Sequence, residues 1–335
     1  MLTMTDTASR WRTGMVKWLE TRTVGPGGVV WSWVNPHHPG YAYPEIAGYL
    51  LCFFTQEGTD CSLQCQIARR LCDDLARSGA VGRDGLFYLF DSAMALTGLL
   101  AHGGRCGLEA REKRVIQHAF EVLTARILER NAVWSNNGPS SLERRWSMEF
   151  GPHLLKLSFA LHGAKEHLGR SEGSTVFRRL LEDLLPRFAD GRFRAFGDTS
   201  DCNLHAHCYA LDGLLVPDLA GGIGGDMRHH LFAGADWLAK VQNEFGGLPE
   251  WHDGRIGWGP LRADVAAQAL RLWIFLDRSR YRDQIDRSLK FLRRLQDSSG
   301  GLRFTPESSD VNTWATIFAA QAVGCLQELK PLNII

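Results

Sequence analysis

The sequence lacks several features that mark common classes of protein. Lys and Arg total 38 against 37 Asp and Glu, a net charge of +1, so the basic excess typical of nucleic-acid-binding proteins is missing. No apolar run reaches the roughly 18 residues that cross a bilayer, and charges occupy the N-terminal positions where a secretory signal has its apolar core. The eight cysteines form no CxxC pair, as in a reduced cytosolic protein. We therefore expect a cytoplasmic protein with no nucleic-acid partner and no membrane span.

Strand alternation is also nearly absent, and helical periodicity replaces it. Amphipathic segments with one charged face recur near 9–22, 62–78, 109–129, 174–187, 228–242 and 280–296. Between them lie segments that are apolar or small over most of their circumference, near 44–55, 88–101, 149–163, 203–215, 262–276 and 310–325. Helices of the first kind belong on the outside of a protein and those of the second kind inside it.

Six outer–inner hairpins that close on themselves predict an all-α fold, an (α/α)6 toroid, in a single domain over 1–335. No Pro/Ser-rich stretch is long enough to be a linker between two domains. An open solenoid of stacked helix pairs is the alternative. The long, unequal loops rich in Gly and Trp favour closure.

Three segments carry a family resemblance: YPEIAGYL (43–50), HAHCYALDGLL (205–215) and NTWATIFAAQAV (312–323). They resemble bacterial α/α-toroid proteins encoded with polysaccharide-biosynthesis machinery. That group is similar in architecture to six-hairpin glycosidases, sugar 2-epimerases and terpenoid-cyclase/prenyltransferase toroids. The resemblance implies the fold and a glycan pathway; because one fold carries many activities, it does not select the reaction.

Each expected inner helix has an acidic residue in or near its first turn: Glu45, Asp91, Glu149, Asp201, Asp264 and Asp310. Acidic residues at such positions also serve as caps that complement the helix dipole. In a toroid, however, all six inner N-termini open at one mouth. We therefore expect these carboxylates to converge around a single cavity, some as caps and one or two as acid/base groups.

Polar side chains continue down the expected inner helices at spacings of three, four and seven, which share a helix face. The stripes are Glu149, His153 and Lys156; Asp201, His205, Cys208 and Asp212; Glu45 and Tyr49; and Asp264 and Gln268. Buried charges are costly unless they are paired or wet. The stripes therefore predict a water-accessible central pocket, the alternative being a ring of mutual hydrogen bonds that only fixes helix register.

Tryptophan is abundant, and seven of the 11 lie in loops entering the inner helices or on a first turn: Trp31, Trp33, Trp134, Trp146, Trp251, Trp258 and Trp314. Trp11, Trp18, Trp237 and Trp273 are interpreted as core residues of outer helices. Flat rings beside carboxylates and histidines suit a sugar site, since a ring covers one face of a pyranose. An aromatic cage for an isoprenoid cation and a structural plug of the mouth are the alternatives.

Other motifs point away from metal, nucleotide or terpene chemistry. Cys202, His205, His207 and Cys208 crowd together, but on a helix the two histidines diverge by about 200° and cannot share a zinc ion. Cys61, Cys65 and Cys72 are expected to be packing residues of an outer helix. GGIGG at 221–225 lacks the Lys-Ser/Thr of a P-loop and is interpreted as a flexible loop. GDTSDC at 197–202 has the wrong spacing for a DxDD acid. We expect no metal and no cofactor.

The sequence thus favours an enzyme that acts on a small-molecule or oligosaccharide substrate by general acid/base chemistry. His205 is the favoured base or acid, Asp201 would orient its ring, and Glu45 and Glu149 are the favoured partners. The expected binding surface comprises Tyr43, Tyr49, Asp91, Trp146, His153, Lys156, His207, Trp251, His252, Asp264, Asp310 and Trp314. Epimerisation, hydrolysis and elimination all stay open. A non-catalytic glycan-binding component and an isoprenoid-processing toroid are the other hypotheses.

Overall fold

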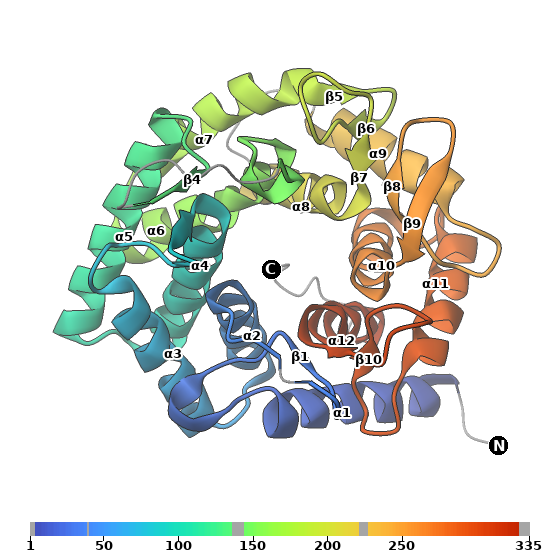
Figure 1. Cartoon of the computed structure of the whole chain (residues 1–335), viewed down its shortest axis with the longest axis horizontal. Coiled ribbons are helices and arrows are strands. Elements are labelled where there is room, and N and C mark those ends of the chain that lie inside the picture. The colour runs from blue at the N-terminus through green and yellow to red at the C-terminus, as the bar shows by residue number, and fades with distance from the viewer. Residues whose placement is uncertain (1–3, 39, 136–143, 221–226, 328–335) are drawn as a thin grey trace.

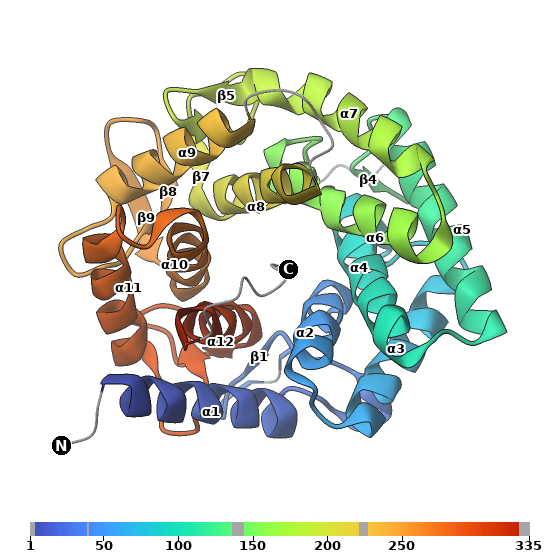
Figure 2. The same ribbon diagram turned by 180° about the vertical axis from the view of Figure 1, so that it is seen from behind.

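A computed structural model of the protein describes residues 4–38, 40–135, 144–220 and 227–327. These residues contain twelve α-helices, arranged as two concentric rings (Figures 1 and 2). The outer ring comprises α1 (Met4–Arg22), α3 (Cys61–Leu75), α5 (Ala110–Leu128), α7 (Glu172–Leu184), α9 (Met227–Val241) and α11 (Arg282–Leu295). The inner ring comprises α2 (Pro44–Glu57), α4 (Leu89–Cys106), α6 (Ser158–Leu168), α8 (Leu204–Ala220), α10 (Ala263–Asp277) and α12 (Thr313–Gln327). The predicted (α/α)6 toroid is confirmed.

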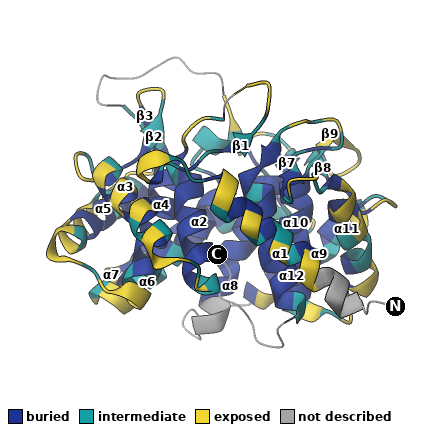
Figure 3. Cartoon of the chain, turned by 90° about the horizontal axis from the view of Figure 1, so that it is seen from below, coloured by how far each residue is buried: buried dark blue, intermediate teal, exposed yellow. Residues whose placement is uncertain are grey.

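The two rings differ in burial as their sequences predict. Along α11 the buried residues recur at helical spacing, and charged residues occupy most of the remaining positions. Along α10 every residue from Ala263 to Ile274 is buried. Viewed from the side, exposed residues gather on the outer helices, whereas the residues of the inner helices are mostly buried and drawn in dark blue (Figure 3). No helix in the described ranges has the length and the apolar run that a membrane crossing requires.

Small residues set the spacing of the inner helices. A Cβ atom added to Gly48 on α2 would lie 2.1 Å from the carbonyl oxygen of Met94 on α4. One added to Gly98, on the next turn of α4, would lie 2.6 Å from the carbonyl oxygen of Gly48. The two backbones therefore touch along this seam, and a side chain at either glycine would force the helices apart.

Short antiparallel strands occupy the loops that lead from outer to inner helices. They form four small sheets: β1 (Trp33–Val34), β11 (Val311–Asn312) and β10 (Leu302–Arg303); β2 (Gly82–Arg83), β3 (Leu86–Tyr88) and β4 (Val133–Trp134); β5 (Phe188–Ala189) and β6 (Arg192–Phe193); and β7 (Cys202–Asn203), β8 (Pro249–His252) and β9 (Gly257–Leu261). Strands of two to five residues are too short to show alternation in the sequence, which explains why they were not predicted.

The first and last hairpins are joined by one of these sheets. Trp33 of β1 pairs with Asn312 of β11, and the hydroxyl of Thr313 donates a hydrogen bond to the carbonyl oxygen of Trp31 at 2.7 Å. Strand pairing between the two ends of the chain closes the ring, as expected, rather than leaving an open solenoid. Seen from the side, the strands lie at the same end of the ring (Figure 3).

The third inner helix departs from the expected range of 149–163. Residues Trp146–Met148 form a 3-10 turn, η2; Glu149 has an extended backbone; and Pro152–Leu157 form a 3-10 helix, η3, before α6 begins. The cause is Pro152, because a residue before proline avoids the helical region, and Gly151 is accordingly extended at φ −133°. Two further 3-10 turns are η1 (Pro26–Gly28) and η4 (Leu185–Arg187).

Two smaller expectations also need comment. Trp273 lies on the inner helix α10 rather than on an outer helix, although it is fully buried in the core as expected, and its indole donates to the Ala235 carbonyl at 3.0 Å. The GGIGG segment at 221–225, expected to be a flexible loop, lies outside the described residues.

The glycine seam leads to a stability prediction. Gly48→Ala should lower the free energy of unfolding by about 1–3 kcal/mol or more, because the added methyl group overlaps the Met94 carbonyl. Gly14→Ala on the outer helix α1 is the control, since its nearest neighbouring atom would be 3.5 Å away, and alanine favours a helix by about 1 kcal/mol over glycine. Urea unfolding of both variants measures the difference. Equal free energies of unfolding for Gly48→Ala and Gly14→Ala would contradict the close approach of α2 and α4.

Candidate functional site

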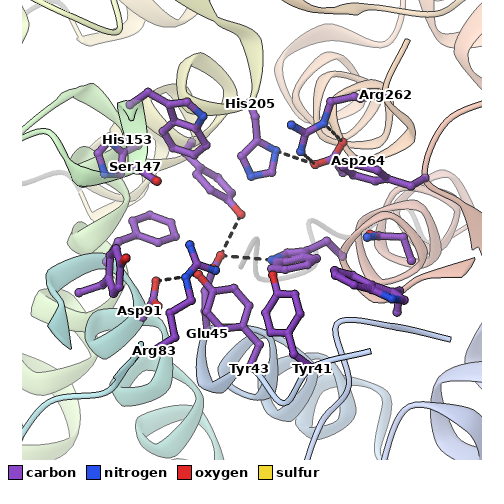
Figure 4. A pocket seen from close by; sticks show the side chains of 18 of the residues that line it. Tyr41, Tyr43, Glu45, Arg83, Asp91, Ser147, His153, His205, Arg262 and Asp264 are labelled. Carbon is purple, nitrogen blue, oxygen red and sulfur yellow. Dashed lines mark hydrogen bonds and ion pairs between the residues drawn. The ribbon is translucent and has the colours of Figure 1, made fainter. Parts of the chain in front are cut away.

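A cavity of about 300 Å³ opens at the end of the ring where the inner helices begin. The N-terminal turns of α2, α4, α8 and α10 and the loops before α6 and α12 supply its walls (Figure 4). Its lining residues are Trp33, Tyr41, Tyr43, Glu45, Arg83, Tyr88, Phe90, Asp91, Trp146, Ser147, His153, His205, Tyr209, Arg262, Asp264, Phe304, Asp310, Asn312 and Trp314. The predicted convergence is therefore present in part. Of the residues expected at the mouth, four of the six carboxylates (Glu45, Asp91, Asp264 and Asp310) and three of the seven tryptophans (Trp33, Trp146 and Trp314) line the cavity.

The first polar cluster in the cavity joins α8 to α10. Nδ1 of His205 lies 2.9 Å from Oδ2 of Asp264, and the guanidinium of Arg262 contacts both oxygens of the same carboxylate at 3.0 and 2.5 Å. Burial opposes ionisation, but Arg262 and His205 together hold the pKa of Asp264 well below its usual value. Nδ1 of His205 also lies 2.9 Å from Nε2 of Gln268. In the tautomer whose Nδ1–H donates to Asp264, Nε2 is the ring nitrogen that can accept a proton.

The second polar cluster lies on the opposite side of the cavity, where α2 and α4 begin. Oε1 of Glu45 accepts hydrogen bonds from the Trp314 indole at 3.2 Å and from the Tyr209 hydroxyl at 3.3 Å. The hydroxyl of Tyr43 donates to Asp91 at 3.2 Å. Burial raises the pKa of Glu45, although His205 and Trp314 oppose the rise. Burial beside Glu45 raises the pKa of Asp91 still further.

The two clusters face each other. Figure 4 shows His205 and Asp264 on one side of the cavity and Glu45 and Asp91 on the other. Tyr209 spans the space between them, because its ring lies 4.2 Å from the His205 ring while its hydroxyl contacts Glu45. The cavity thus places a histidine and a carboxyl group of raised pKa on different sides of one space.

Aromatic rings form the remaining walls. Trp146 packs against both His205 and His153, with ring centroids 5.7 and 5.3 Å apart, and Trp314 packs against Tyr43 at 5.3 Å. His153 is neutral in this setting, because burial lowers its pKa to about 3. These rings leave flat apolar surfaces beside the polar clusters, which is the composition expected of a site for a small polar ligand.

Asp310 lines the cavity but serves ring closure. Its carboxylate accepts a hydrogen bond from Asn35 at 2.6 Å and lies 3.2 Å from Nε2 of His38, so it links the last hairpin to the first. Only Glu45, Asp91 and Asp264 of the six expected acidic residues lie in the first turn of an inner helix. The helices α8 and α12 are capped instead by Asn203 and Asn312, whose side-chain oxygens accept backbone N–H groups at 3.0 and 2.9 Å.

Lys156 and Tyr49, expected at the binding surface, lie below it. Lys156 is fully buried and forms an ion pair with Asp212 at 2.6 Å. Asp212 lies two turns beyond His205 along α8. Arg271 of α10 contacts the same carboxylate and also donates to Gln321 of α12 at 2.6 Å. The lower parts of the polar stripes therefore satisfy one another, which was the alternative interpretation, and only their upper parts reach the cavity.

Five other expected site residues lie outside the cavity. Asp201 precedes β7 and cannot orient His205, because α8 begins only at Leu204 and the two residues do not share a helix face; Asp264 orients the ring instead. Glu149 sits on the extended segment before Pro152, where it pairs with Arg144 at 2.7 Å.

The two remaining histidines satisfy backbone groups. Nδ1 of His207 accepts from the backbone N–H of Phe193, and its Nε2 faces the Gly234 carbonyl at 3.4 Å. Nδ1 of His252 accepts from the N–H of Gly254 at 2.8 Å, within a turn. Trp251 lies on β8 and stacks against its neighbours at the rim rather than entering the cavity.

Several cavity residues were not foreseen from the sequence. Arg262 stands directly before the α10 helix, and its position two residues before Asp264 is the signal that could have identified it. Arg83 is the last residue of β2 and lies over the rings of Tyr43 and Tyr88. Tyr209 is one turn beyond His205, so the same helix face that selected His205 also contained it.

No group of three or more His, Cys, Asp or Glu side chains among the described residues is placed to hold a metal ion. Cys202 and Cys208, which lie near His205 and His207 in the sequence, are both buried. Burial raises the pKa of each thiol well above its usual value.

Comparison with known proteins identifies the fold only. No protein-family model matches the chain, and no curated protein matches its sequence significantly. Among solved structures, cellobiose 2-epimerase from Bacillus thermoamylovorans B4167 is similar at a TM-score of 0.75 and 10% identity, over 96% of this chain and all of that one. An alpha-amylase from Clostridium perfringens reaches 0.72 at 10% identity, over 95% and 98%.

The same fold extends to other chemistry. A type II terpene cyclase from Scytonema is similar at a TM-score of 0.62 and 12% identity, over 96% of this chain and 98% of that one. Glycosidases and a polysaccharide lyase are also among the matches. The expected architecture, shared by six-hairpin glycosidases, sugar 2-epimerases and terpene-cyclase toroids, is thus confirmed. The shared fold carries enzymes of several reaction types, so the site must distinguish them.

The buried neutral histidines predict how stability depends on pH. Burial lowers the pKa of His207 to about 4, whereas in the unfolded chain it takes up a proton near pH 6.5. Between these values the unfolded state binds more protons, so the native state loses stability as the pH falls. From pH 7 to 5, wild type should lose about 2 kcal/mol more than His207→Gln in urea unfolding.

The control for this measurement is His118→Gln, which changes an exposed histidine on α5 and should follow the wild-type dependence on pH. If His207→Gln and wild type lose stability in parallel between pH 7 and 5, His207 is protonated in the native state and its assignment here is incorrect.

Proposed function

We propose that the protein is an enzyme that acts on a sugar or oligosaccharide by general acid/base catalysis, with His205 and Glu45 as the two proton-transfer groups. The observation that carries the proposal is their arrangement: a histidine oriented by an ionised carboxylate lies across one cavity from a carboxyl group of raised pKa. Two groups whose environments separate their proton affinities in this way suit an acid and a base.

His205 is the proposed base. With Nδ1 held by Asp264, Nε2 is the ring nitrogen available to take a proton from a sugar carbon, a hydroxyl group or a water molecule. The ionised Asp264 then stabilises the imidazolium that forms, and Arg262 keeps Asp264 ionised. Asp264 is therefore a positioning residue, because it acts through His205.

Glu45 is the proposed acid. Its burial favours the protonated carboxyl, and the hydrogen bonds from Tyr209 and Trp314 hold one oxygen in place. A carboxyl group that keeps its proton at higher pH than usual can donate it to a leaving oxygen or to a carbanion-like intermediate. Burial and the neighbouring Glu45 raise the pKa of Asp91 well above its usual value, so Asp91 is a second carboxyl group beside Glu45 that can hold a proton.

The composition of the walls favours a sugar as substrate. Trp146 and Trp314 present flat rings beside the two clusters, and such rings cover the apolar face of a pyranose. Arg83, Asn312 and Ser147 line the same cavity and offer hydrogen-bonding groups for hydroxyls. Together with the resemblance to toroid proteins of polysaccharide biosynthesis, this supports a cytoplasmic role in a bacterial glycan pathway.

The test combines a substrate screen with two substitutions. Nucleotide sugars, neutral disaccharides and uronic-acid oligosaccharides are assayed for epimerised, hydrolysed or unsaturated products, which separates the three reactions. On the substrate found, His205→Asn and Glu45→Gln should each lose on the order of 10²-fold or more in kcat. Asp264→Asn should lose less, because it orients the base and does not transfer the proton. Trp146→Ala should raise KM.

His252→Asn is the matched control, since this histidine lies outside the cavity and contacts a turn; its kcat should stay at the wild-type value. Circular dichroism and thermal melting verify that each variant is folded. Full turnover by His205→Asn per folded molecule would refute the proposed base. Glycan binding without turnover by the wild type would instead identify a non-catalytic glycan-binding component.

An isoprenoid substrate is the second candidate, favoured by one specific observation. Asp91 is a carboxyl group kept neutral by burial, and its neighbours in the cavity include the rings of Tyr43 and Phe90. A neutral carboxylic acid in an aromatic cavity can protonate an alkene, and the surrounding rings can stabilise the resulting carbocation. The ion pairs of Arg262 with Asp264 and Glu250 make the opposite wall too polar for a hydrocarbon, which is why sugar is preferred.

The same screen therefore includes geranylgeranyl diphosphate and a terpene-tailed aromatic acid. Under the sugar proposal neither isoprenoid compound is consumed. Asp91→Asn should then retain more activity than Glu45→Gln, because Asp91 affects the pKa of Glu45 but does not transfer the proton. Cyclised product that disappears with Asp91→Asn but persists with His205→Asn would favour the isoprenoid candidate.

A further inference from the structure

A row of aromatic rings lies at the rim of the ring, outside the cavity. The rings of Phe196 and Trp251 are stacked, with centroids 6.1 Å apart and planes 11° from parallel. Trp251 and Trp258, which are cross-strand partners on β8 and β9, are 6.3 Å apart and 9° from parallel. Three nearly parallel rings from two separate segments of the chain thus form one continuous aromatic row.

The row has a closed end and an open end. At the closed end the guanidinium of Arg144 covers the face of Phe196 at 4.5 Å, and Arg144 is itself bonded to Glu149 and Asp198. At the open end Trp258 is 43% exposed, beside Ile256 at 69%. Indole surface left in water at the mouth of a cavity is a mark of a binding surface rather than of a core.

Two chain segments connect the row to residues that line the cavity. Arg144 stands two residues before Trp146, whose ring lines the cavity. Trp251 pairs with Asn203, two residues before His205. The strand β9, which carries Trp258, ends at Leu261, directly before Arg262, the residue that holds Asp264. A ligand that emerges from the cavity on the His205 side therefore meets this row.

The size of the cavity indicates what that ligand is. A volume of about 300 Å³ is at the lower end of the range for small-molecule sites, so it holds the reacting end of a glycan and not a long chain. A chain of sugar units continues in one direction and needs flat apolar surfaces in series with polar groups beside them. The row offers one such surface, at the exposed Trp258, because Phe196 and Trp251 are stacked against neighbouring rings and Arg144 covers Phe196. Arg144 and Asp198, 50% and 64% exposed, offer polar groups beside the row.

We infer that Trp258, held in place by the stacked rings of Trp251 and Phe196, forms an outer subsite that binds a distal sugar unit of an oligosaccharide whose reacting unit occupies the cavity. The inference rests on the proposed function and narrows the substrate to an oligosaccharide or polysaccharide end rather than a free monosaccharide or nucleotide sugar. Trp258, at the open end, is the residue that contacts the ligand most directly.

The experiment compares long and short glycans by isothermal titration calorimetry. The probes are cellobiose and cellohexaose, maltose and maltohexaose, and di- and hexagalacturonate. The key variant is Trp258→Leu, which keeps apolar volume in the hairpin and removes the flat ring; Trp258→Phe restores a ring. Leu128→Ala, which removes a 62% exposed apolar side chain from the end of α5, is the control.

For the hexasaccharide that binds, Trp258→Leu should raise Kd about 2- to 10-fold, and Trp258→Phe should recover part of the loss. Binding and turnover of the matching disaccharide should not change in either variant, and Leu128→Ala should behave as wild type at both lengths. A lower melting temperature of Trp258→Leu with unchanged hexasaccharide affinity would show that the row only stabilises the hairpin.

The two levels of the proposal fail in different ways. If His205→Asn abolishes turnover of a disaccharide while Trp258→Leu leaves hexasaccharide binding unaltered, the outer subsite is refuted and the proposed function stands. If no probe of either length binds wild type, the sugar proposal and the outer subsite are refuted together.

Discussion

Antiparallel pairing between the first and last hairpins is the contact on which the site depends. The β1–β11 ladder is two residues long, yet it and the bond from Asn35 to Asp310 join segments 275 residues apart. One cavity wall comes from each side of this junction, with Trp33 from the first hairpin and Trp314 from the last. Without closure the helix pairs would still stack, but Glu45 would lose its hydrogen bond to Trp314 and the cavity would lack a wall.

Below the cavity, buried charged side chains occupy the interior of the ring of helices. Lys156, Asp212 and Arg271 come from three neighbouring inner segments and share one carboxylate. Burial lowers the pKa of Lys156 to about 8, although Asp212 opposes the shift, and the ammonium lies 4.6 Å from the Tyr209 ring. Such a cluster costs desolvation energy that its mutual contacts must offset. Its position beneath Tyr209 leaves the mouth as the natural direction for a longer ligand to extend.

Helical periodicity was sufficient to predict the twelve helices and their two rings, because burial differs so clearly between helices such as α10 and α11. It was also sufficient to bring Glu45, Asp264 and His205 to one mouth. It failed where local chain chemistry overrides periodicity. Pro152 breaks the third inner helix and displaces Glu149, and Asp201 precedes β7 instead of sharing a face of α8, which begins at Leu204 close to its expected start. Rim strands of two residues leave no pattern to detect.

The partner of His205 shows why the remaining errors follow from the architecture. A stripe along one helix pairs residues one turn apart, which suggested Asp201, but adjacent inner helices of a toroid approach closely at their first turns. His205 therefore meets Asp264 on the next inner helix along the chain. Glu45 is held in the same way, by Tyr209 of α8 and Trp314 of α12. On this scaffold the interacting groups are contributed by different hairpins, either adjacent ones or ones that face each other across the cavity. A substitution in one hairpin can therefore change the proton-transfer pair while the rings of helices stay intact.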